Sequence, residues 1–346
     1  MEIAGRRVGA GAPAYVVAEI SANHAQDFEQ ASALVRAAKD AGVDAVKLQT
    51  YTPDTITLRS DAPHFRIQAG TMWDGRTLYD LYAEAYMPWE WQPRLKAIAD
   101  EIDITLFSSP FDETAVDALE QMSVPAYKIA SFELVDLPLI RRVAATGKPL
   151  IISTGMATLA EIDEAVRAAR DGGAREIALL HCTSAYPAPP DEANLRTIPH
   201  LADAFGLPVG LSDHTQGIAV PVAAAALGAA IIEKHFTASR ATPTADAAFS
   251  LEPAELRAMV DQIRVAEAAV GSIRHAPTEH EAGGRRLRRS LFVVADVKAG
   301  ERFTADNVRS IRPADGLHTR YLPDVLGRRA TRDIARGTPL SWDLLA

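Results

Sequence analysis

The chain has 346 residues, of which 48% are hydrophobic and 23% are charged, and its formal net charge is −9. The length predicts a large domain plus a small one, the composition is that of an ordinary globular protein, and the acidic balance argues against a nucleic-acid partner. The sequence contains no apolar run of membrane-spanning length, no secretory signal and only one cysteine, Cys182, so we expect a cytoplasmic protein without a membrane span or an internal disulfide.

Eight short apolar runs alternate with helical patterns between residue 14 and about residue 270. None of these runs alternates with polar residues, as expected for parallel strands that are covered on both faces. Eight strands at this spacing predict a closed (β/α)8 TIM barrel. A doubly wound open sheet is the alternative, but the glycine-rich turn that usually follows its first strand is absent. The expected strands are residues 15–18, 45–48, 104–107, 126–129, 150–152, 177–180, 209–211 and 230–232.

The segments between the strands include five clear amphipathic patterns. We expect Asp27 to cap the first helix, and Thr158 with Glu161 to form a capping box on another. Residues 51–87 form an aromatic-rich insertion after the second strand. An insertion of that length is either functional or a packing hairpin over the barrel rim, and the sequence leaves both readings open. The expected helices are residues 28–39, 90–101, 113–121, 159–170 and 255–270.

The composition changes after the last of these helices. Residues 275–289 are polar, glycine-containing and basic, which is typical of a linker. Residues 290–346 contain short strand-like runs among many turn signals. We therefore expect a barrel domain over residues 1–274, a linker over residues 275–289 and a small β-rich domain over residues 290–346.

Residues 209–235 predict a compact strand–helix–strand unit in which polar residues ending in a histidine follow each strand. Such a parallel crossover makes its two strands neighbours, about 5 Å apart. His214 and His235 are then expected side by side at one edge of the sheet. Two imidazoles there can share a divalent metal ion and leave most of its coordination sphere open, as a catalytic site requires. The alternative is a pair of hydrogen-bonded core histidines.

The active site of a TIM barrel lies at the C-terminal ends of its strands, and polar residues stand there on all eight predicted strands. Lys47 and Lys128 offer positive charge beside several serine hydroxyls, a combination that suits the phosphate and carboxylate of a small anionic ligand. Glu19 and Glu133 are candidates for acid–base catalysis. The serines are Ser131, Ser153, Ser184 and Ser212.

Several long motifs resemble those of the sialic acid synthase family. The motifs are AEISANH at 18–24, DAVKLQT at 44–50, YKIASFE at 127–133, ISTGM at 152–156, HCTSAYP at 181–187, GLSDHT at 210–215 and EKHFT at 233–237. The C-terminal region, with RRSLFV at 288–293 and SIRP at 310–313, resembles the antifreeze-like (SAF) domain of that family. The resemblance implies a TIM barrel followed by a SAF domain, and an enzyme that condenses phosphoenolpyruvate with an acylamino sugar.

Within the family, the chain is most similar to the branch that makes pseudaminic acid, a nonulosonic acid. The similarity is carried by KLQTYTPDTITL at 47–58, WDGRTLYDLY at 73–82 and FSLEP at 249–253. It implies 2,4-diacetamido-2,4,6-trideoxy-L-altrose as the sugar, in place of N-acetylmannosamine. Synthesis of N-acetylneuraminic or legionaminic acid by a member of the same family is the alternative.

The resemblance also implies a metal site and a phosphoenolpyruvate pocket. His214 and His235 match the family's metal ligands, commonly for manganese, with magnesium or cobalt as alternatives. Ser184 also falls in the pocket, at a position where sialic acid synthases often have asparagine. The other residues that match the pocket are Lys47, Lys128, Ser131, Ser153 and Ser212.

On the sugar side the resemblance implies Glu19, Tyr186 and Asp246, and it places Glu133 near the reacting centre. Arg312 matches an arginine that reaches the sugar bound by the partner subunit of a domain-exchanged homodimer. One departure concerns Asp246, which the family usually precedes with glycine and proline. Here the preceding residues are threonine and alanine, so the backbone of this loop is expected to differ.

These residues predict condensation with C–O cleavage, in which a metal ion on the two histidines acts as the Lewis acid and Glu19 or Glu133 orients the attacking water. Lys47 and Lys128 would stabilise the departing phosphate. Two other classes stay open. Schiff-base aldolases carry lysines at strand ends, where Lys47, Lys128 and Lys234 stand. A non-catalytic sugar-binding protein would bind its ligand without releasing phosphate.

Overall fold

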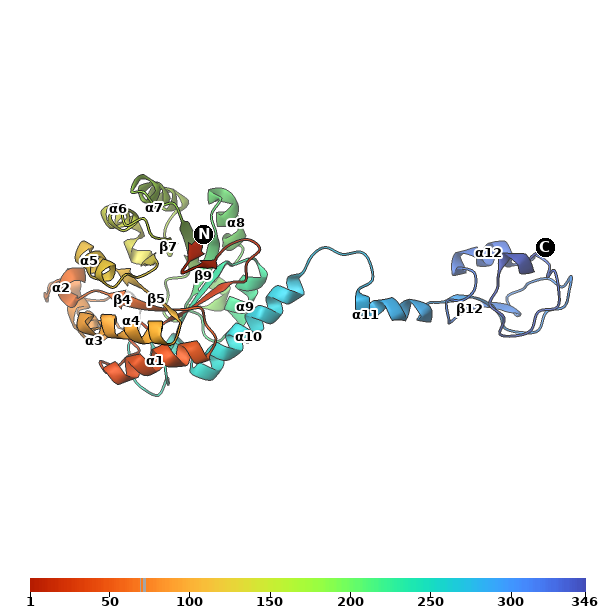
Figure 1. The fold of residues 1–346 in the computed structure, drawn as a ribbon, viewed down its shortest axis with the longest axis horizontal. Coiled ribbons are helices and arrows are strands. Elements are labelled where there is room, and N and C mark those ends of the chain that lie inside the picture. Colours follow the sequence, from red (N-terminus) through yellow and green to blue (C-terminus); the bar gives the residue numbers. More distant parts are fainter. Residues whose placement is uncertain (69, 71–72) are drawn as a thin grey trace. The chain divides into compact units, whose positions relative to one another are not determined.

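The first part of the chain is a closed barrel of eight parallel strands, as predicted (Figure 1). The computed structural model describes residues 1–68, 70 and 73–346. Each strand is hydrogen-bonded to the next in the order β10, β3, β4, β5, β6, β7, β8, β9, and β9 closes onto β10. The strands are β3 (Tyr15–Glu19), β4 (Ala45–Thr50), β5 (Thr105–Pro110), β6 (Tyr127–Ile129), β7 (Leu150–Ser153), β8 (Ile177–Cys182), β9 (Val209–Asp213) and β10 (Ile231–His235).

Helices alternate with these strands along the chain and surround the barrel (Figure 1). Asp27 caps α1, because its side chain accepts hydrogen bonds from the backbone N–H groups of Glu29 and Gln30. Thr158 and Glu161 form the expected capping box of α7. The helices are α1 (Phe28–Asp40), α4 (Gln92–Glu101), α5 (Glu113–Gln121), α6 (Leu137–Ala144), α7 (Leu159–Asp171), α8 (Thr197–Phe205), α9 (Ala219–Ala226) and α10 (Pro253–Val270).

The helix expected over residues 90–101 begins two residues later than its sequence pattern suggests. A 3-10 turn, η2 (Trp89–Trp91), comes first, and α4 starts at Gln92. Pro93 explains the difference, since a proline lacks a backbone N–H and is accommodated only in the first turn of an α-helix. The boundary matters for the site because Gln92 is buried and its amide donates to the carbonyl of Gln49, at the end of β4.

The N-terminus forms a small hairpin of β1 (Glu2–Ile3) and β2 (Arg6–Arg7) at the other end of the barrel. The backbone N–H of Glu2 donates to the side chain of Glu176, which precedes β8. Ile3 is completely buried. The Arg6 guanidinium pairs with Asp44, just before β4. The hairpin therefore contacts the N-terminal ends of the strands and leaves the C-terminal ends, where the polar residues stand, uncovered by it.

The insertion at residues 51–87 packs over the C-terminal end of the barrel. It contains α2 (Pro53–Ile56), η1 (Pro63–Phe65) and α3 (Leu78–Ala85), while residues 69, 71 and 72 lie outside the described part of the chain. The ring of Tyr82 on α3 lies 5.7 Å from that of Tyr51, which in turn lies 5.1 Å from Phe111 after β5. These contacts hold the insertion above β4 and β5.

The chain divides into two compact units, residues 1–271 and residues 272–346. The second contains α11 (Glu279–Ala282), η6 (Gly283–Leu287), the antiparallel pair β11 (Ser290–Val293) and β12 (Val308–Ile311), η7 (Thr319–Tyr321), α12 (Leu322–Val325) and η8 (Trp342–Leu344). Its own apolar core includes Leu291, Phe303 and Leu340, all at most 1% exposed. No helix among the described residues is long and apolar enough to cross a membrane.

Candidate active site

Four charged side chains meet inside the C-terminal end of the barrel, and all four are buried. Glu233 on β10 is the centre of the group: its Oε1 lies 3.4 Å from the Nζ of Lys128 on β6 and 3.7 Å from the Nζ of Lys47 on β4. Lys47 also forms an ion pair with Glu19, its register neighbour on β3. Two ammonium groups and two carboxylates therefore pair with one another in the barrel interior, where each residue is at most 4% exposed.

Burial and pairing act in opposite directions on these groups. Burial alone would raise the pKa of Glu233, but Lys128 and Lys47, with a hydrogen bond from Ser212, hold it at about 2. Burial lowers the pKa of Lys47, yet Glu19 and Glu233 outweigh burial and raise it. Burial raises the pKa of Glu19 to about 7 because Lys47 offsets the lost hydration only in part. Glu19 is thus the member of the cluster that can exchange a proton near neutral pH.

Hydroxyl groups surround the two lysines. Ser212 on β9 donates to Oε1 of Glu233 at 2.9 Å, and Ser109 on β5 accepts from Lys47 at 3.3 Å. Ser131 and Ser184 lie 3.0 Å apart, on the loops after β6 and β8. Ser153, at the end of β7, is buried, and its Oγ has no hydrogen-bond partner among the described residues. The structure therefore brings the predicted lysines and serines to one end of the barrel.

Gly155 allows the hydroxyl loops to come this close. A Cβ atom at this position would lie 2.5 Å from Cβ of Ser131 and 2.9 Å from Oγ of Ser184. Gly155 also has a φ of +47°, in the left-handed region that favours glycine. Both the backbone conformation and the lack of space explain the glycine in the ISTGM motif.

The two predicted histidines face each other at the ends of β9 and β10. Their ring centroids lie 5.4 Å apart. Burial lowers the pKa of His214 to about 4, and it lowers that of His235 well below the usual range, with further lowering by His214. Both rings are therefore neutral at pH 7, and each has a lone pair available for a metal ion.

Hydrogen bonding fixes which nitrogen of His214 carries that lone pair. Its Nδ1 lies 2.9 Å from the carbonyl oxygen of Thr183, which can only accept, so Nδ1 carries the proton and Nε2 is free to coordinate. Nδ1 of His235 is buried without a hydrogen-bond partner in the described structure. Asp246 Oδ2 lies 3.6 Å from it, beyond hydrogen-bond distance. No group of three or more His, Cys, Asp or Glu residues that could hold a metal ion occurs among the described residues.

Aromatic rings line one side of the histidine pair. The Tyr186 ring lies 4.5 Å from that of His214, and the Phe249 ring lies 4.9 Å from that of His235. Tyr186 and Phe249 are 5.4 Å apart, and Trp73 from the insertion is 5.8 Å from Tyr186. The insertion therefore packs against the candidate site through Trp73, and a role for it in binding stays a prediction.

Glu133 occupies the remaining side, on η3 (Ser131–Val135) after β6. Burial raises its pKa to about 7, and Lys128 opposes this shift to a smaller extent. Its Oε2 is buried and has no hydrogen-bond partner in the described part of the protein. A carboxylate with these properties can take up or release a proton at neutral pH.

Lys234, named by the sequence, does not join this group. Lys234 pairs with Asp213 and donates to the carbonyl of Thr215. Because side chains alternate along a strand, Lys234 points away from its neighbours Glu233 and His235 and toward the helix layer. Arg312 lies in the second unit, where it is exposed directly after β12.

Three residues of the site received no role from the sequence. Glu233 stood in the EKHFT motif, and Trp73 and Phe249 stood in motifs used only to identify the branch of the family. The position of Glu233 could have indicated its place in the site. Glu233 stands two residues before His235, so both side chains point to the same face of β10. Nothing in the sequence placed Trp73 beside Tyr186.

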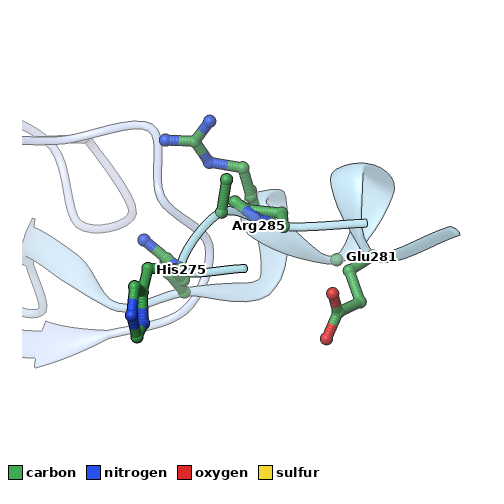
Figure 2. Close-up of a pocket in the computed structure, with 7 residues that line it drawn as sticks. His275, Glu281 and Arg285 are labelled. Atoms are coloured by element: carbon green, nitrogen blue, oxygen red, sulfur yellow. The ribbon is translucent and has the colours of Figure 1, made fainter. Parts of the chain in front are cut away.

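A separate hollow of about 450 Å³ lies in the second unit, around α11 and η6. Figure 2 shows His275 and Glu281 on its rim, without convergence on a common point. Its lining side chains are exposed or nearly so. It lacks the buried, converging polar groups of the barrel end, so the chemistry belongs to the barrel.

Comparison with known proteins agrees with this arrangement. The NeuB family matches residues 34–275, and the SAF domain matches residues 288–346. The pseudaminic acid synthase of Helicobacter pylori is 43% identical over 332 residues, covering 96% of this chain and 97% of that protein. The N,N'-diacetyllegionaminic acid synthase of Legionella pneumophila is 35% identical over 340 residues, covering 97% and 95%.

A solved structure supports the same assignment over the full length. The spore coat polysaccharide biosynthesis protein SpsE of Bacillus subtilis has a TM-score of 0.67 and 37% identity, covering 100% of this chain and 99% of that one. The sequence motifs, the barrel and the C-terminal unit all agree with these matches. The chain belongs to the NeuB family and ends in a SAF domain.

Proposed function

We propose that this enzyme condenses phosphoenolpyruvate with 2,4-diacetamido-2,4,6-trideoxy-L-altrose and water to give pseudaminic acid and phosphate. The observation that carries the proposal is the convergence of Lys47, Lys128 and the serine hydroxyls beside a neutral histidine pair. The choice of sugar is supported by the higher identity to a pseudaminic acid synthase, 43%, than to a legionaminic acid synthase, 35%.

Phosphoenolpyruvate fits the cationic side of the site. Lys47 and Lys128 supply charge, and Ser131, Ser153 and Ser184 supply hydroxyl donors for its phosphate and carboxylate. Because water is excluded from these buried groups, each charge–charge interaction is stronger than it would be in solvent. The same lysines stabilise the phosphate as its negative charge increases on departure.

The sugar fits the aromatic side. Trp73, Tyr186 and Phe249 offer apolar ring surface beside His214 and His235. A trideoxy sugar with two acetamido groups has three methyl groups that can contact such a surface, whereas N-acetylmannosamine has one. This match supports a deoxygenated, doubly acetamidated substrate over N-acetylmannosamine.

A divalent metal ion fits the histidine pair. Nε2 of His214, left free by the hydrogen bond at Nδ1, and the neutral ring of His235, whose Nδ1 is buried without a hydrogen-bond partner among the described residues, would provide two protein ligands. We propose manganese, with magnesium or cobalt as substitutes. The ion would supply Lewis acidity toward the aldehyde oxygen of the open-chain sugar.

Glu133 is the residue we propose to handle the water. The methylene carbon of phosphoenolpyruvate forms a bond to the sugar aldehyde carbon, the aldehyde oxygen takes the π electron pair and a proton to become a hydroxyl, and water adds to the carbon that carries the phosphate. Glu133, with its pKa near 7, accepts the proton of that water. The tetrahedral intermediate then expels phosphate with cleavage of its C–O bond. Glu19 is held by Lys47 and is left to orient the sugar.

Two of the three strand-end lysines are poorly placed for a Schiff-base mechanism. Such a mechanism needs a neutral amine facing the substrate. Lys234 is paired with Asp213 on the helix side of β10, and the pKa of Lys47 is raised by Glu19 and Glu233 despite its burial. Both lysines are therefore poorly suited to nucleophilic attack. Burial lowers the pKa of Lys128, so this alternative depends on Lys128, and the borohydride test below applies to it.

We also propose a domain-exchanged homodimer, in which the SAF unit of each chain serves the barrel of its partner through Arg312. The charges of the two units support an association between them. Residues 1–271 contain 22 Lys and Arg against 36 Asp and Glu, whereas residues 272–346 contain 14 against 9. The resulting formal charges of −14 and +5 attract each other.

Phosphate release identifies the reaction and the sugar together. Incubated with phosphoenolpyruvate and manganese, the enzyme should release phosphate with the diacetamido trideoxy altrose, and far more slowly with N-acetylmannosamine or the legionaminic acid precursor. In ¹⁸O-water, the label should enter the sugar acid and stay out of the phosphate. Label in the phosphate, or inactivation by borohydride and pyruvate, would contradict the proposed chemistry.

Metal dependence can be tested on the two histidines separately. We expect EDTA to abolish phosphate release and added manganese to restore it. His214→Ala and His235→Ala should each lose bound manganese in equilibrium dialysis, because each removes one of two protein ligands. His200→Ala changes an exposed histidine on α8 and should leave both properties intact. Turnover that persists in either of the first two variants would exclude this metal site.

The pH profile reports on Glu133. If its carboxylate takes the proton from water, kcat should fall as the pH drops through about 7, because protonation removes the base. Glu133→Gln should lower kcat about 100-fold or more and remove this acidic limb. Glu113→Gln, at an exposed position on α5, is the control and should keep the limb. An unchanged limb in Glu133→Gln would assign the titration to another group.

Mixing two inactive variants tests the exchanged dimer. His214→Ala chains have a defective barrel with an intact Arg312, and Arg312→Ala chains have the reverse. In a mixed dimer, the intact barrel meets the intact arginine, so random mixing should restore about a quarter of the wild-type activity. Mixing the two variants while unfolded and refolding them together ensures that subunits assemble at random. If Arg312 served its own barrel, the mixture would be no more active than its components.

A further inference from the structure

The loop after β3 connects two segments that border the site. It contains three non-glycine residues with left-handed backbone, Ser21, Ala25 and Gln26, at φ values of 45°, 49° and 55°. Such conformations are costly for residues other than glycine and persist only where surrounding contacts enforce them. Gln26 donates to the carbonyls of Glu84 and Tyr86 at the end of α3, so one side of the loop is attached to the insertion.

The other side of the loop is attached to the segment after β10 through Asn23. This side chain is completely buried. Its Nδ2 donates to the carbonyl of Phe236 at 2.9 Å and to Oγ of Ser250 at 2.8 Å. Its Oδ1 accepts from Oγ1 of Thr244 at 2.6 Å. One amide group thus uses both of its N–H donors and one oxygen lone pair to bind three points of a single segment.

These three points surround Asp246. Thr244 precedes it by two residues, Ser250 follows it by four and donates to its backbone carbonyl at 2.7 Å, and Phe236 is the residue after His235. The Asp246 side chain also interacts with Ser21. Asp246 Oδ2 lies 3.6 Å from Nδ1 of His235, and the backbone N–H of Ala22, in the loop that carries Asn23, donates to the same oxygen at 3.5 Å.

We propose that Asn23 is a positioning residue that holds the segment 244–250 so that the Asp246 carboxylate faces His235 on the sugar side of the site. Asn23 itself touches no substrate and acts through Thr244, Ser250 and Phe236. The loss of this clamp impairs use of the sugar and spares the binding of phosphoenolpyruvate, whose lysines lie on β4 and β6. The expected loss of sugar use rests on the proposed function. The positioning of segment 244–250 rests only on the hydrogen bonds of Asn23.

Thr244→Val is the sharpest test, because it keeps the shape of the side chain and removes one hydrogen bond. We expect kcat/KM for the sugar to fall about three- to tenfold, the effect of one lost hydrogen bond, with KM for phosphoenolpyruvate unchanged. Thr242→Val, in the same loop, is the matched control and should behave like the wild type. Equal losses for both substrates would show a general structural defect and overturn the proposal.

A double-mutant cycle separates positioning from packing. In an Asp246→Ala background, Thr244→Val should have no further effect on kcat/KM, because the group that it positions is already gone. Additive effects would overturn the assignment. Asn23→Ala should lose more than Thr244→Val, since it removes all three hydrogen bonds.

Hydrogen exchange provides a readout that needs no substrate. Thr244→Val should speed exchange of the backbone amides in residues 244–250, with the melting temperature of the barrel unchanged. Unchanged exchange there would overturn the clamp even if the enzyme used another sugar. Conversely, a wild-type enzyme inactive on the proposed sugar, with faster exchange in the variant, would refute the function and leave the clamp standing.

Discussion

The site depends on the burial of two lysines, which is possible only because two carboxylates are buried with them. Glu233 is central: its Oε1 lies within 3.7 Å of both ammonium groups and accepts from Ser212. Removing one member of such a group leaves an unpaired charge in the interior, which typically costs 3–5 kcal/mol. The carboxylates therefore raise the pKa of Lys47 and keep it charged, and Glu233 offsets part of the lowering that burial imposes on the pKa of Lys128.

The alternation of side chains along parallel strands separates the chemistry from the scaffold. On β10, Glu233 and His235 point into the barrel, while Lys234 between them points outward to Asp213. On β9, Ser212 and His214 follow the same rule, with Asp213 outward. A single strand thus provides a carboxylate paired with two lysines, one of the two facing histidines and one side of a buried structural ion pair within three residues.

The aromatic side of the site, in contrast, is formed by loops that follow different strands. Trp73 comes from the insertion, Tyr186 from the loop after β8 and Phe249 from the loop after β10. Rigid strands fix the lysines and histidines, which on the proposed function serve the phosphoenolpyruvate and metal side of the reaction. On the same proposal the loops shape the surface toward the sugar, so a different acylamino sugar can be accommodated without moving the lysines or histidines.

The sequence by itself determined the barrel, the SAF domain and most of the residues at the strand ends, because each depends on local patterns: buried apolar runs, caps such as Asp27, and long motifs. It did not predict the contacts or the structural roles of Glu233, Trp73 and Asn23. Glu233 contacts Lys128 across 105 residues of chain, and Asn23 contacts Ser250 across 227. Such pairs form only when β10 closes the barrel against β3, and no local pattern encodes a contact that ring closure creates.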